Sequence, residues 1–290
     1  MATLVVFTDL DGTLLDHDHY GWKPATAVID QLRERSIPLV LVTSKTRAEV
    51  KRIRVSLGNG HPFVTENGAA IHVPVGYFAG VSTTAESPCV QEQSGRGYAD
   101  IVEVLHDLRG RHQYRFKGFA DHQPASLAAL TGLSLGDAGR ALQRDGSEPI
   151  DWQGSDASLA TFRVRLQEAG LSLLRGGRFF HVVADGAHGG GDKGAAVAKL
   201  LERYRLQSVR TDASAQVRSV ALGDAQNDLP MFDQVDVAVV IPTPRGESLR
   251  PVGAAELHTA SEPGPLGWAT EMGRILGCER PPQGAGGPGL

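Results

Sequence analysis

Four short apolar runs are the feature of this 290-residue chain that most constrains its fold. The runs are rich in Val, Leu and Ile and occupy residues 4–7, 38–42, 218–222 and 237–241. Because a run without a polar face is buried on both sides, each one predicts a strand of a parallel sheet. Helical apolar stripes alternate with them at Val28, Ile29 and Leu32, at Val50, Ile53 and Leu57, and at Val197, Leu200, Leu201 and Tyr204. This alternation predicts an α/β fold with an open, Rossmann-like parallel sheet and right-handed crossovers.

The middle of the chain follows a different pattern. It combines helical apolar stripes around Leu105 and Leu166 with the alternating segment RFFHVVAD, and it has no clear parallel-strand run. The turn-rich stretches GVSTTAESP and GAHGGG flank this region. We therefore predict an inserted α+β cap domain at residues 82–187, within a catalytic α/β core formed by 1–81 and 188–290. The tail from about residue 280 is rich in Pro and Gly, which predicts disorder.

Composition and charge argue against two classes of partner. Apolar residues make up 41% of the chain and charged residues 21%, which allows a sizeable core. The net charge is −4 with both signs interspersed, so neither nucleic acid nor an anionic membrane is expected as the main partner. No apolar stretch approaches the ~20 residues of a membrane span. The N-terminus lacks a signal-peptide pattern and Cys89 and Cys278 are far apart, so we expect a cytoplasmic location.

Residues that can do chemistry follow the predicted strands at their carboxyl ends. Asp9 and Asp11 follow the first run, Thr43 follows the second, and GDAQND (223–228) follows the third, while Lys193 opens a predicted helix. Ligands of open α/β sheets bind at this edge. Asp9 and Asp11 would repel each other if the strand continued, since both side chains would then point the same way. An oxygen-seeking Mg²⁺ would offset that repulsion, so the edge is predicted to bind Mg²⁺ and a phosphate.

Four motifs, in this order along the chain, resemble those of the haloacid dehalogenase superfamily of phosphotransferases. They are DLDGT, the strand-ending Thr43, Lys193 within GGDKG, and GDAQND. A DxD motif alone would also fit a calcium-binding loop, but such a loop continues with oxygen ligands, whereas Leu14 and Leu15 follow here. The resemblance implies a Mg²⁺-dependent phosphoryl-transfer enzyme with a capped α/β core.

The resemblance also implies roles for individual residues. Asp9 would be the nucleophile that becomes an aspartyl phosphate, and Asp11 would protonate the leaving group and then activate water. Thr43 and Lys193 would hold the phosphoryl oxygens. The metal would be bound by Asp9, by the main-chain carbonyl of Asp11 and by Asp224, with Asn227 and Asp228 nearby.

Further segments narrow the resemblance to the mannosyl-3-phosphoglycerate phosphatase family. They include VTSKTRAEV, VTENGAAI, SEPIDW and GGRFFHV, and they extend over roughly residues 5–236. The resemblance implies hydrolysis of mannosyl-3-phosphoglycerate to mannosylglycerate and phosphate, in a compatible-solute pathway. A glucosyl-3-phosphoglycerate phosphatase, a broader sugar-phosphate phosphatase, a phosphomannomutase and a non-catalytic phosphoglycerate-binding sensor remain alternatives. Substrate contacts are expected from Ser44, Lys45, Asn67, Arg178 and His181.

Several of these residues also have a plain structural interpretation. Arg178 and His181 could decorate the surface of an alternating strand, although a substrate with a phosphate and a carboxylate favours cations from the cap. Glu66 fits a turn residue that also lines the cleft. The DHDH segment (16–19) looks like a metal cluster, but a solvated flap fits it better. Asp192 is predicted to be the N-cap of the helix that follows it.

Overall fold

A computed structural model of the chain describes residues 3–17, 20–186, 190–211, 214–244, 249, 251, 253 and 256–277. The chain divides into two compact units. The first comprises Met1–Leu41, Tyr204–Asp224 and Met231–Leu290, and the second comprises Val42–Arg203 and Ala225–Pro230. The predicted tail, Cys278, residues 18–19 of the DHDH segment and residues 187–189 of the Gly-rich stretch lie outside the described residues.

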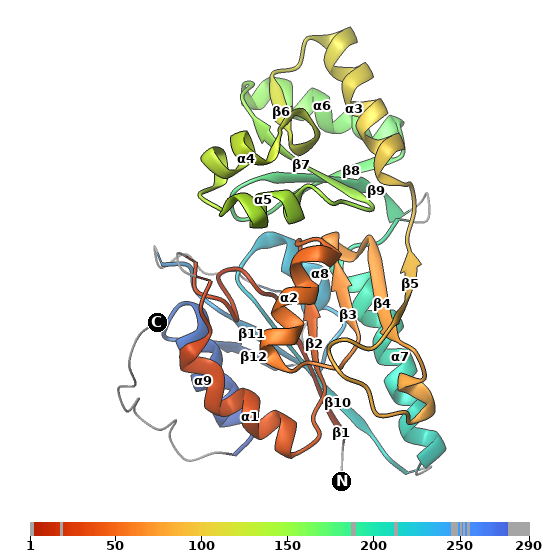
Figure 1. Ribbon diagram of the computed structural model, residues 1–290, viewed down its shortest axis with the longest axis vertical. Coiled ribbons are helices and arrows are strands. Elements are labelled where there is room, and N and C mark those ends of the chain that lie inside the picture. The colour runs from red at the N-terminus through yellow and green to blue at the C-terminus, as the bar shows by residue number, and fades with distance from the viewer. Residues whose placement is uncertain are drawn as a thin grey trace. The chain divides into compact units, whose positions relative to one another are not determined.

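The first unit is built on parallel strands in the order β12-β11-β10-β1-β2 (Figure 1). They are β1 (Thr3–Thr8), β2 (Leu39–Val42), β10 (Val217–Gly223), β11 (Val237–Val240) and β12 (Glu256–Thr259). The four apolar runs are therefore confirmed as strands of a mostly parallel sheet in an α/β fold. The sequence did not reveal β12, because three of its four residues are exposed and it has no apolar run.

Two helices of the first unit, α1 (Thr26–Glu34) and α9 (Gly264–Ile275), lie side by side (Figure 1). The buried residues of α1 form the apolar stripe that the sequence predicts. Trp268 of α9 is fully buried, and its indole N–H donates a hydrogen bond of 3.0 Å to the hydroxyl of Thr8. This bond ties α9 to the carboxyl end of β1, the point from which Asp9 projects.

The second unit contains β3 (Phe63–Thr65), β4 (Ala70–Pro74) and β5 (Cys89–Gln93), and β4 pairs antiparallel with both neighbours. The helix α2 (Arg47–Leu57) follows β2. It begins with a capping box, in which the side chains of Thr46 and Glu49 each accept a hydrogen bond from the other's main-chain N–H. Two further helices, α7 (Lys193–Thr211) and α8 (Leu229–Phe232), contribute residues to both units.

A separate antiparallel sheet in the second unit has the strand order β6-β7-β9-β8. Its strands are β6 (Phe116–Gly118), β7 (Ser147–Trp152), β8 (Leu171–Arg175) and β9 (Phe180–Ala184). The helices around it are α3 (Tyr98–His112), α4 (Pro124–Thr131), α5 (Leu135–Ala141) and α6 (Asp156–Glu168). All eight elements fall within the predicted insertion at 82–187, and they have the α+β character that the sequence indicates.

The apolar core of this smaller sheet comes from α3, α6 and the strands. Phe162 of α6 is fully buried, and its ring stacks on Trp152 of β7 with 5.0 Å between the ring centroids.

β5 also lies in the range predicted as insertion, yet it pairs with β4. The boundaries of the insertion stay a prediction. Among the described residues, no helix is both long enough and apolar enough to cross a membrane.

Candidate active site

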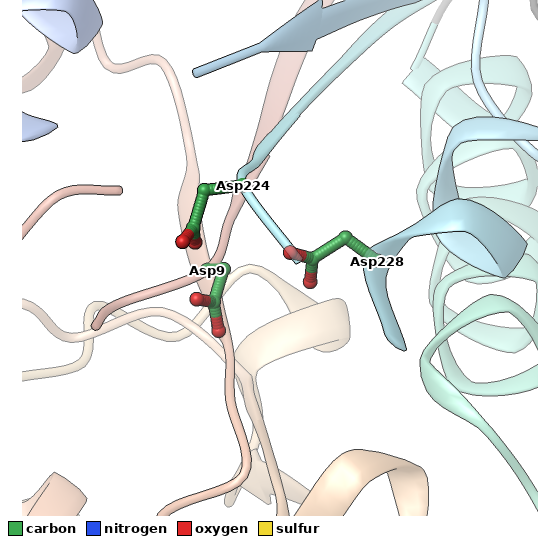
Figure 2. Close-up of side chains that lie close together, drawn as sticks. All are labelled: Asp9, Asp224 and Asp228. Atoms are coloured by element: carbon green, nitrogen blue, oxygen red, sulfur yellow. The ribbon is translucent and has the colours of Figure 1, made fainter. Parts of the chain in front are cut away.

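Asp9 and Asp224 lie together at the carboxyl end of two neighbouring strands of the first unit. Thr8, the last residue of β1, is in register with Leu222 of β10, so the chain leaves both strands at the same edge. The main-chain N–H of Asp9 donates a hydrogen bond of 2.9 Å to the carbonyl of Leu222. A carboxylate oxygen of Asp9 lies within 4.8 Å of one of Asp224. Figure 2 draws both side chains, with Asp228 of the second unit as the third.

The chain turns sharply after Asp9, and this turn separates the two acids of the DLDGT motif. The strand β1 ends at Thr8, so Asp9 and Asp11 do not project from one continuing strand. Leu10 instead starts a tight turn, in which its carbonyl accepts hydrogen bonds from two N–H groups further along the chain, at 3.2 and 2.8 Å. Asp11 is half-buried within this turn. The turn gives two acids of one motif different environments, which a straight strand would not.

Gly12 and Thr13 adapt this turn to Asp224. Gly12 has a φ of +79°, and a Cβ on it would lie 2.6 Å from a carboxylate oxygen of Asp224, so a side chain here would be strained and would collide. The hydroxyl of Thr13 donates a hydrogen bond of 2.8 Å to Asp224. Thr13 was not predicted as a site residue, although it belongs to the DLDGT motif. It holds the Asp224 carboxylate in place beside Asp9.

The expected phosphate-binding residue Thr43 is fully buried at the carboxyl end of β2. Its hydroxyl accepts a hydrogen bond of 3.2 Å from the main-chain N–H of Lys45, which fixes the path of the chain over three residues. Ser44 and Lys45 are half-buried, and the Lys45 ammonium lies 3.9 Å from the carboxylate of Glu49. The three residues Thr43, Ser44 and Lys45 therefore form one compact loop before α2.

Lys193 is the first residue of α7, as predicted, and only 1% of it is exposed. Its ammonium donates a hydrogen bond of 2.6 Å to Asp228, whose side chain is fully buried. Asp192 caps the helix as expected, since its carboxylate accepts a hydrogen bond of 2.8 Å from the N–H of Ala195. A buried cation at a helix N-terminus opposes the helix dipole, so an anionic partner is required there.

Asn67 and Asn227 form an amide pair in the second unit. The side-chain amide of Asn227 donates a hydrogen bond of 2.8 Å to the Asn67 carbonyl oxygen. Asn67 is fully buried and has a φ of +60°, a conformation that non-glycine residues seldom adopt. Asn227 precedes Asp228 in the chain, so the amide pair lies next in sequence to the Lys193–Asp228 ion pair. The predicted site residues Asn67, Asn227, Asp228 and Lys193 thus form two linked polar pairs.

The two predicted cap residues have different surroundings. The guanidinium of Arg178 donates to the carbonyls of Thr131, at 3.0 Å, and Leu130, at the end of α4. His181 is 8% exposed, and burial, followed by the charges of Arg144 and Lys193, lowers its pKa to about 3. His181 is therefore a neutral imidazole at pH 7 and not the cation that the sequence suggested. Contact of either residue with a substrate stays a prediction.

Another buried acid of the second unit, Glu148, was not singled out as a site residue. Its carboxylate accepts hydrogen bonds of 2.8 Å from the Tyr98 hydroxyl and from the N–H of Ala120. Burial raises the pKa of Glu148 to about 7 and raises that of Tyr98 as well. The alternating pattern of SEPIDW gives no sign of this, because the polarity of a residue does not reveal what covers it.

The donors at the edge of the first unit suit a hard divalent cation. Asp9 and Asp224 offer carboxylate oxygens close enough to share one ion, and Mg²⁺ is bound in proteins through one or two carboxylates of this kind. Since two carboxylates this close repel each other, an ion between them would also stabilise both in their charged forms. The residues present therefore fit a metal-binding site.

Comparisons with known proteins agree with this chemistry. Residues 6–83 match the family model of the haloacid dehalogenase-like hydrolases. The chain is 35% identical over 280 residues to the glucosyl-3-phosphoglycerate/mannosyl-3-phosphoglycerate phosphatase of Methanococcoides burtonii, covering 94% of this chain and 97% of that protein. It is 34% identical over 274 residues to a protein of the same name from Persephonella marina, again covering 94% and 97%.

The fold is also found among solved structures. The crystal structure of a protein from Thermoplasma acidophilum is similar with a TM-score of 0.64 at 18% identity, covering 96% of this chain and 98% of that one. At that identity the likeness shows the fold alone. The relatives of 34–35% identity, which match nearly the whole length, show the family. The chain therefore belongs to the haloacid dehalogenase-like hydrolases, and it is a phosphatase that cleaves phosphoric monoesters.

Proposed function

We propose that this protein is a Mg²⁺-dependent phosphatase of mannosyl-3-phosphoglycerate that works through an aspartyl-phosphate intermediate. The observation that carries the substrate class is the identity of 34–35% to two phosphatases named for glycosyl-3-phosphoglycerates, over 94% of the chain. The pairing of Asp9 with Asp224, at the sheet edge where α/β proteins bind ligands, supports the chemistry.

In the first step, a carboxylate oxygen of Asp9 attacks the phosphorus, and the ester P–O bond breaks. Asp11 gives its proton to the departing glycerate oxygen, so that the leaving group departs as an alcohol. The Thr43 hydroxyl and the Lys193 ammonium bind the phosphoryl oxygens and stabilise the charge that develops on them. Asp228 holds the Lys193 ammonium in place through its 2.6 Å hydrogen bond.

In the second step, Asp11 takes a proton from a water molecule, whose oxygen attacks the phosphorus. The bond between phosphorus and Asp9 breaks, which releases inorganic phosphate and restores the carboxylate. Asp9, the Asp11 carbonyl and Asp224 would hold Mg²⁺, which when bound offsets the negative charge of the phosphate and the acids. Asn227 and Asp228 would lie near the metal and hold the residues around it in position.

The rest of the substrate is proposed to contact Ser44, Lys45, Asn67, Arg178 and His181. Since burial lowers the pKa of His181, it would meet the substrate as an uncharged imidazole, through a hydrogen bond. Arg178 would keep its bonds to the end of α4 and offer its remaining N–H groups. A cytoplasmic location stays a prediction, as do the absence of a nucleic-acid or membrane partner and the position of the inserted domain.

Phosphate release from mannosyl-3-phosphoglycerate, with and without Mg²⁺, tests the proposal. Wild-type protein should release phosphate only with the metal, and Asp9→Asn should be inactive, because an amide is not a nucleophile. Asp11→Asn should lose about 10²–10⁴-fold in rate, the usual contribution of a general acid and base. Full activity of Asp9→Asn would refute the covalent mechanism.

Glucosyl-3-phosphoglycerate is a second candidate substrate, because the names of both relatives include it. Comparing kcat/KM for the two glycosyl substrates and for simple hexose phosphates separates a selective from a broad phosphatase. Transfer of the phosphoryl group to a sugar instead of water would indicate a mutase. Binding of phosphoglycerate without turnover would indicate a sensor.

A further inference from the structure

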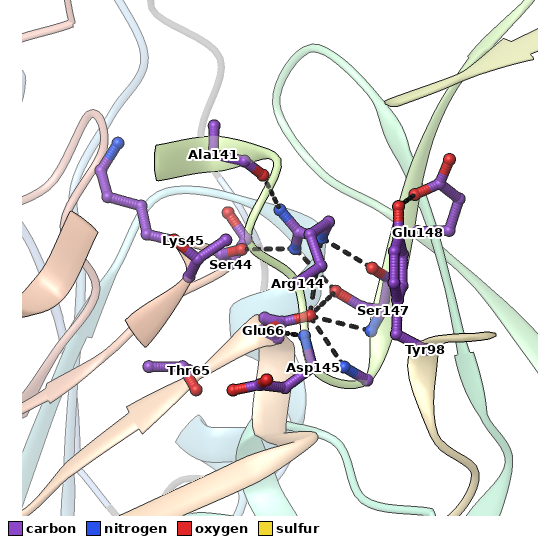
Figure 3. A network of polar contacts seen from close by, with 12 residues as sticks. Ser44, Lys45, Thr65, Glu66, Tyr98, Ala141, Arg144, Asp145, Ser147 and Glu148 are labelled. Atoms are coloured by element: carbon purple, nitrogen blue, oxygen red, sulfur yellow. Dashed lines mark hydrogen bonds and ion pairs between the residues drawn. The ribbon is translucent and has the colours of Figure 1, made fainter. Parts of the chain in front are cut away.

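Three segments of the second unit meet around two buried side chains, Glu66 and Arg144 (Figure 3). One segment is the loop at residues 43–46, which contains the proposed phosphate-binding residue Thr43. Another begins at Glu66, directly after β3. The third is the turn at residues 144–147, which leads into β7 of the smaller sheet. No step of the proposed reaction uses Glu66 or Arg144.

The carboxylate of Glu66 holds the turn at residues 144–147. It is fully buried, and it accepts main-chain N–H groups from Asp145 at 2.7 Å, Gly146 at 3.1 Å and Ser147 at 2.9 Å. The Ser147 hydroxyl donates a fourth hydrogen bond, of 3.0 Å. A Cβ on Gly146 would lie 2.9 Å from the Cβ of Ala69, so the turn also packs closely on the segment that follows Glu66.

The main chain at Glu66 holds the loop at residues 43–46. The N–H of Glu66 donates to the carbonyl of Lys45 and the N–H of Asn67 to that of Thr43, each at 3.0 Å. Both donor residues have a positive φ, +52° for Glu66 and +60° for Asn67. Such backbone is costly for residues other than glycine and persists only where surrounding contacts hold it, often at functional sites.

Arg144 completes the connection from the other side. Its guanidinium donates to the Ser44 carbonyl at 3.1 Å, to the Ser147 hydroxyl at 2.7 Å and to the Ser147 carbonyl at 2.6 Å. It also lies 3.5 Å from the Glu66 carboxylate, and its side chain is only 2% exposed. Arginine suits this place because its planar fork of donors reaches several acceptors at once, which lysine cannot do.

A second bond ties the same loop to the end of α5. The hydroxyl of Thr46 donates a hydrogen bond of 2.9 Å to the carbonyl of Arg140. Each of the three carbonyls before Thr46 also accepts a hydrogen bond. Those of Thr43 and Lys45 accept from main-chain N–H groups of the Glu66 segment, and that of Ser44 accepts from Arg144. The path of the main chain sets where the Thr43 hydroxyl points, because that hydroxyl accepts the N–H of Lys45.

We propose that Glu66 and Arg144 are positioning residues, which align the phosphate-binding loop by clamping it to the turn that carries β7. The inference rests on the proposed role of Thr43 in binding the phosphoryl group. Through this clamp, the strand β7 and the loop move as one body, so the alignment of Thr43 depends on a segment about a hundred residues away in the sequence. Loss of the clamp misaligns the loop while the acids that do the chemistry remain.

The experiment compares Arg144→Met with wild type on two substrates, mannosyl-3-phosphoglycerate and 4-nitrophenyl phosphate. Since a misplacement near 1 Å can cost about 10²-fold in rate, we expect kcat to fall about 10- to 100-fold on both substrates. KM should rise as well, because Ser44 and Lys45 of the same loop are proposed to contact the substrate, so kcat is compared at saturating substrate. A residue that only stabilises the fold would lower the melting temperature without this loss of kcat at 25 °C.

A matched control is Arg52→Ala. Arg52 bridges α2 and α5 through an ion pair of 3.2 Å with Asp137, but the two side chains are 67% and 39% exposed. An exposed pair of this kind contributes little, so kcat should stay within about twofold of wild type. Arg144→Lys keeps the charge but not the planar fork of donors, so its kcat should lie between those of wild type and Arg144→Met. It is the test variant if Arg144→Met does not fold.

The outcomes separate this inference from the proposed function. If wild-type protein releases phosphate from neither substrate, the proposed function is wrong. If wild type is active and the folded Arg144 variants keep kcat within about twofold of it, only the positioning role is wrong. A loss confined to the glycosyl substrate, or an equal loss in Arg52→Ala, also contradicts the positioning role.

Discussion

Replacing Lys193 by methionine removes the cation from an ion pair that is buried on both sides. The Lys193 and Asp228 side chains are 1% and 0% exposed, and their charged atoms are 2.6 Å apart. In the variant, the Asp228 carboxylate keeps its 3.0 Å hydrogen bond from the N–H of Ala225 but loses this cation. Breaking a buried pair from one side typically costs about 3–5 kcal/mol, so we expect the free energy of unfolding to fall by that amount.

A second substitution separates stability from catalysis. Asp228→Asn removes the buried carboxylate charge that Lys193 no longer offsets, and its side-chain oxygen can still accept the Ala225 N–H. The double variant Lys193→Met/Asp228→Asn should therefore recover most of the lost stability. It should not recover activity, because the ammonium that is proposed to bind the phosphoryl oxygens is absent. Urea unfolding and phosphate release measure the two properties on the same samples.

The control is an ion pair of equal length on the surface. Arg33 and Asp30 are also 2.6 Å apart, but their side chains are 56% and 50% exposed, so Arg33→Met should cost less than about 1 kcal/mol. The reasoning is refuted if Lys193→Met costs no more than Arg33→Met. It is equally refuted if the double variant is as unstable as Lys193→Met, since the cost would then not come from the buried Asp228 charge.

Three further predictions concern the metal and the pH dependence of stability. Asp224→Ala should raise the Mg²⁺ concentration for half-maximal activity by more than about tenfold, and an unchanged value would remove Asp224 from the metal site. The pKa of Glu148 is raised from 4.5 to about 7 by burial, so the folded protein binds this proton more tightly and loses stability as the pH rises between those values. Glu148→Gln should flatten this part of a plot of the free energy of unfolding against pH. An unaltered slope would contradict the role of Glu148. The pKa of His181 is lowered from 6.5 to about 3, so stability is lost as the pH falls through that range. His181→Gln should reduce this loss of stability. Equal acid sensitivity of the variant and the wild type would show that His181 does not cause the loss.

The sequence could predict most of the first unit, because its pattern is local. Apolar runs of four or five residues identify strands that are buried on both faces, and β1, β2, β10 and β11 are found where those runs lie. Parallel strands end at one edge, so the residues after them are expected to meet, as Asp9 and Asp224 do. The strand β12 was not predicted, because it is largely exposed and its residues show no apolar run.

Motifs predicted the residues of the site, and the tertiary structure decided their surroundings. The sequence named Asp9, Lys193 and Asp228, since each stands in a short motif. It could not pair Lys193 with Asp228 at 2.6 Å, because the two residues are 35 positions apart. It likewise could not show that His181 is neutral at pH 7, since burial and nearby cations lower its pKa.

What the sequence determined by itself was the fold class, the order of the motifs and the chemistry that their side chains allow. Only the tertiary structure brought Glu66 and Arg144 into one buried cluster with the loop at residues 43–46. The Glu66 carboxylate accepts hydrogen bonds from residues 79–81 positions away, and Arg144 donates one to Ser44 over a separation of 100 positions. Local sequence patterns do not predict contacts at such separations, because those contacts depend on how distant elements pack and on which polar groups the packing buries.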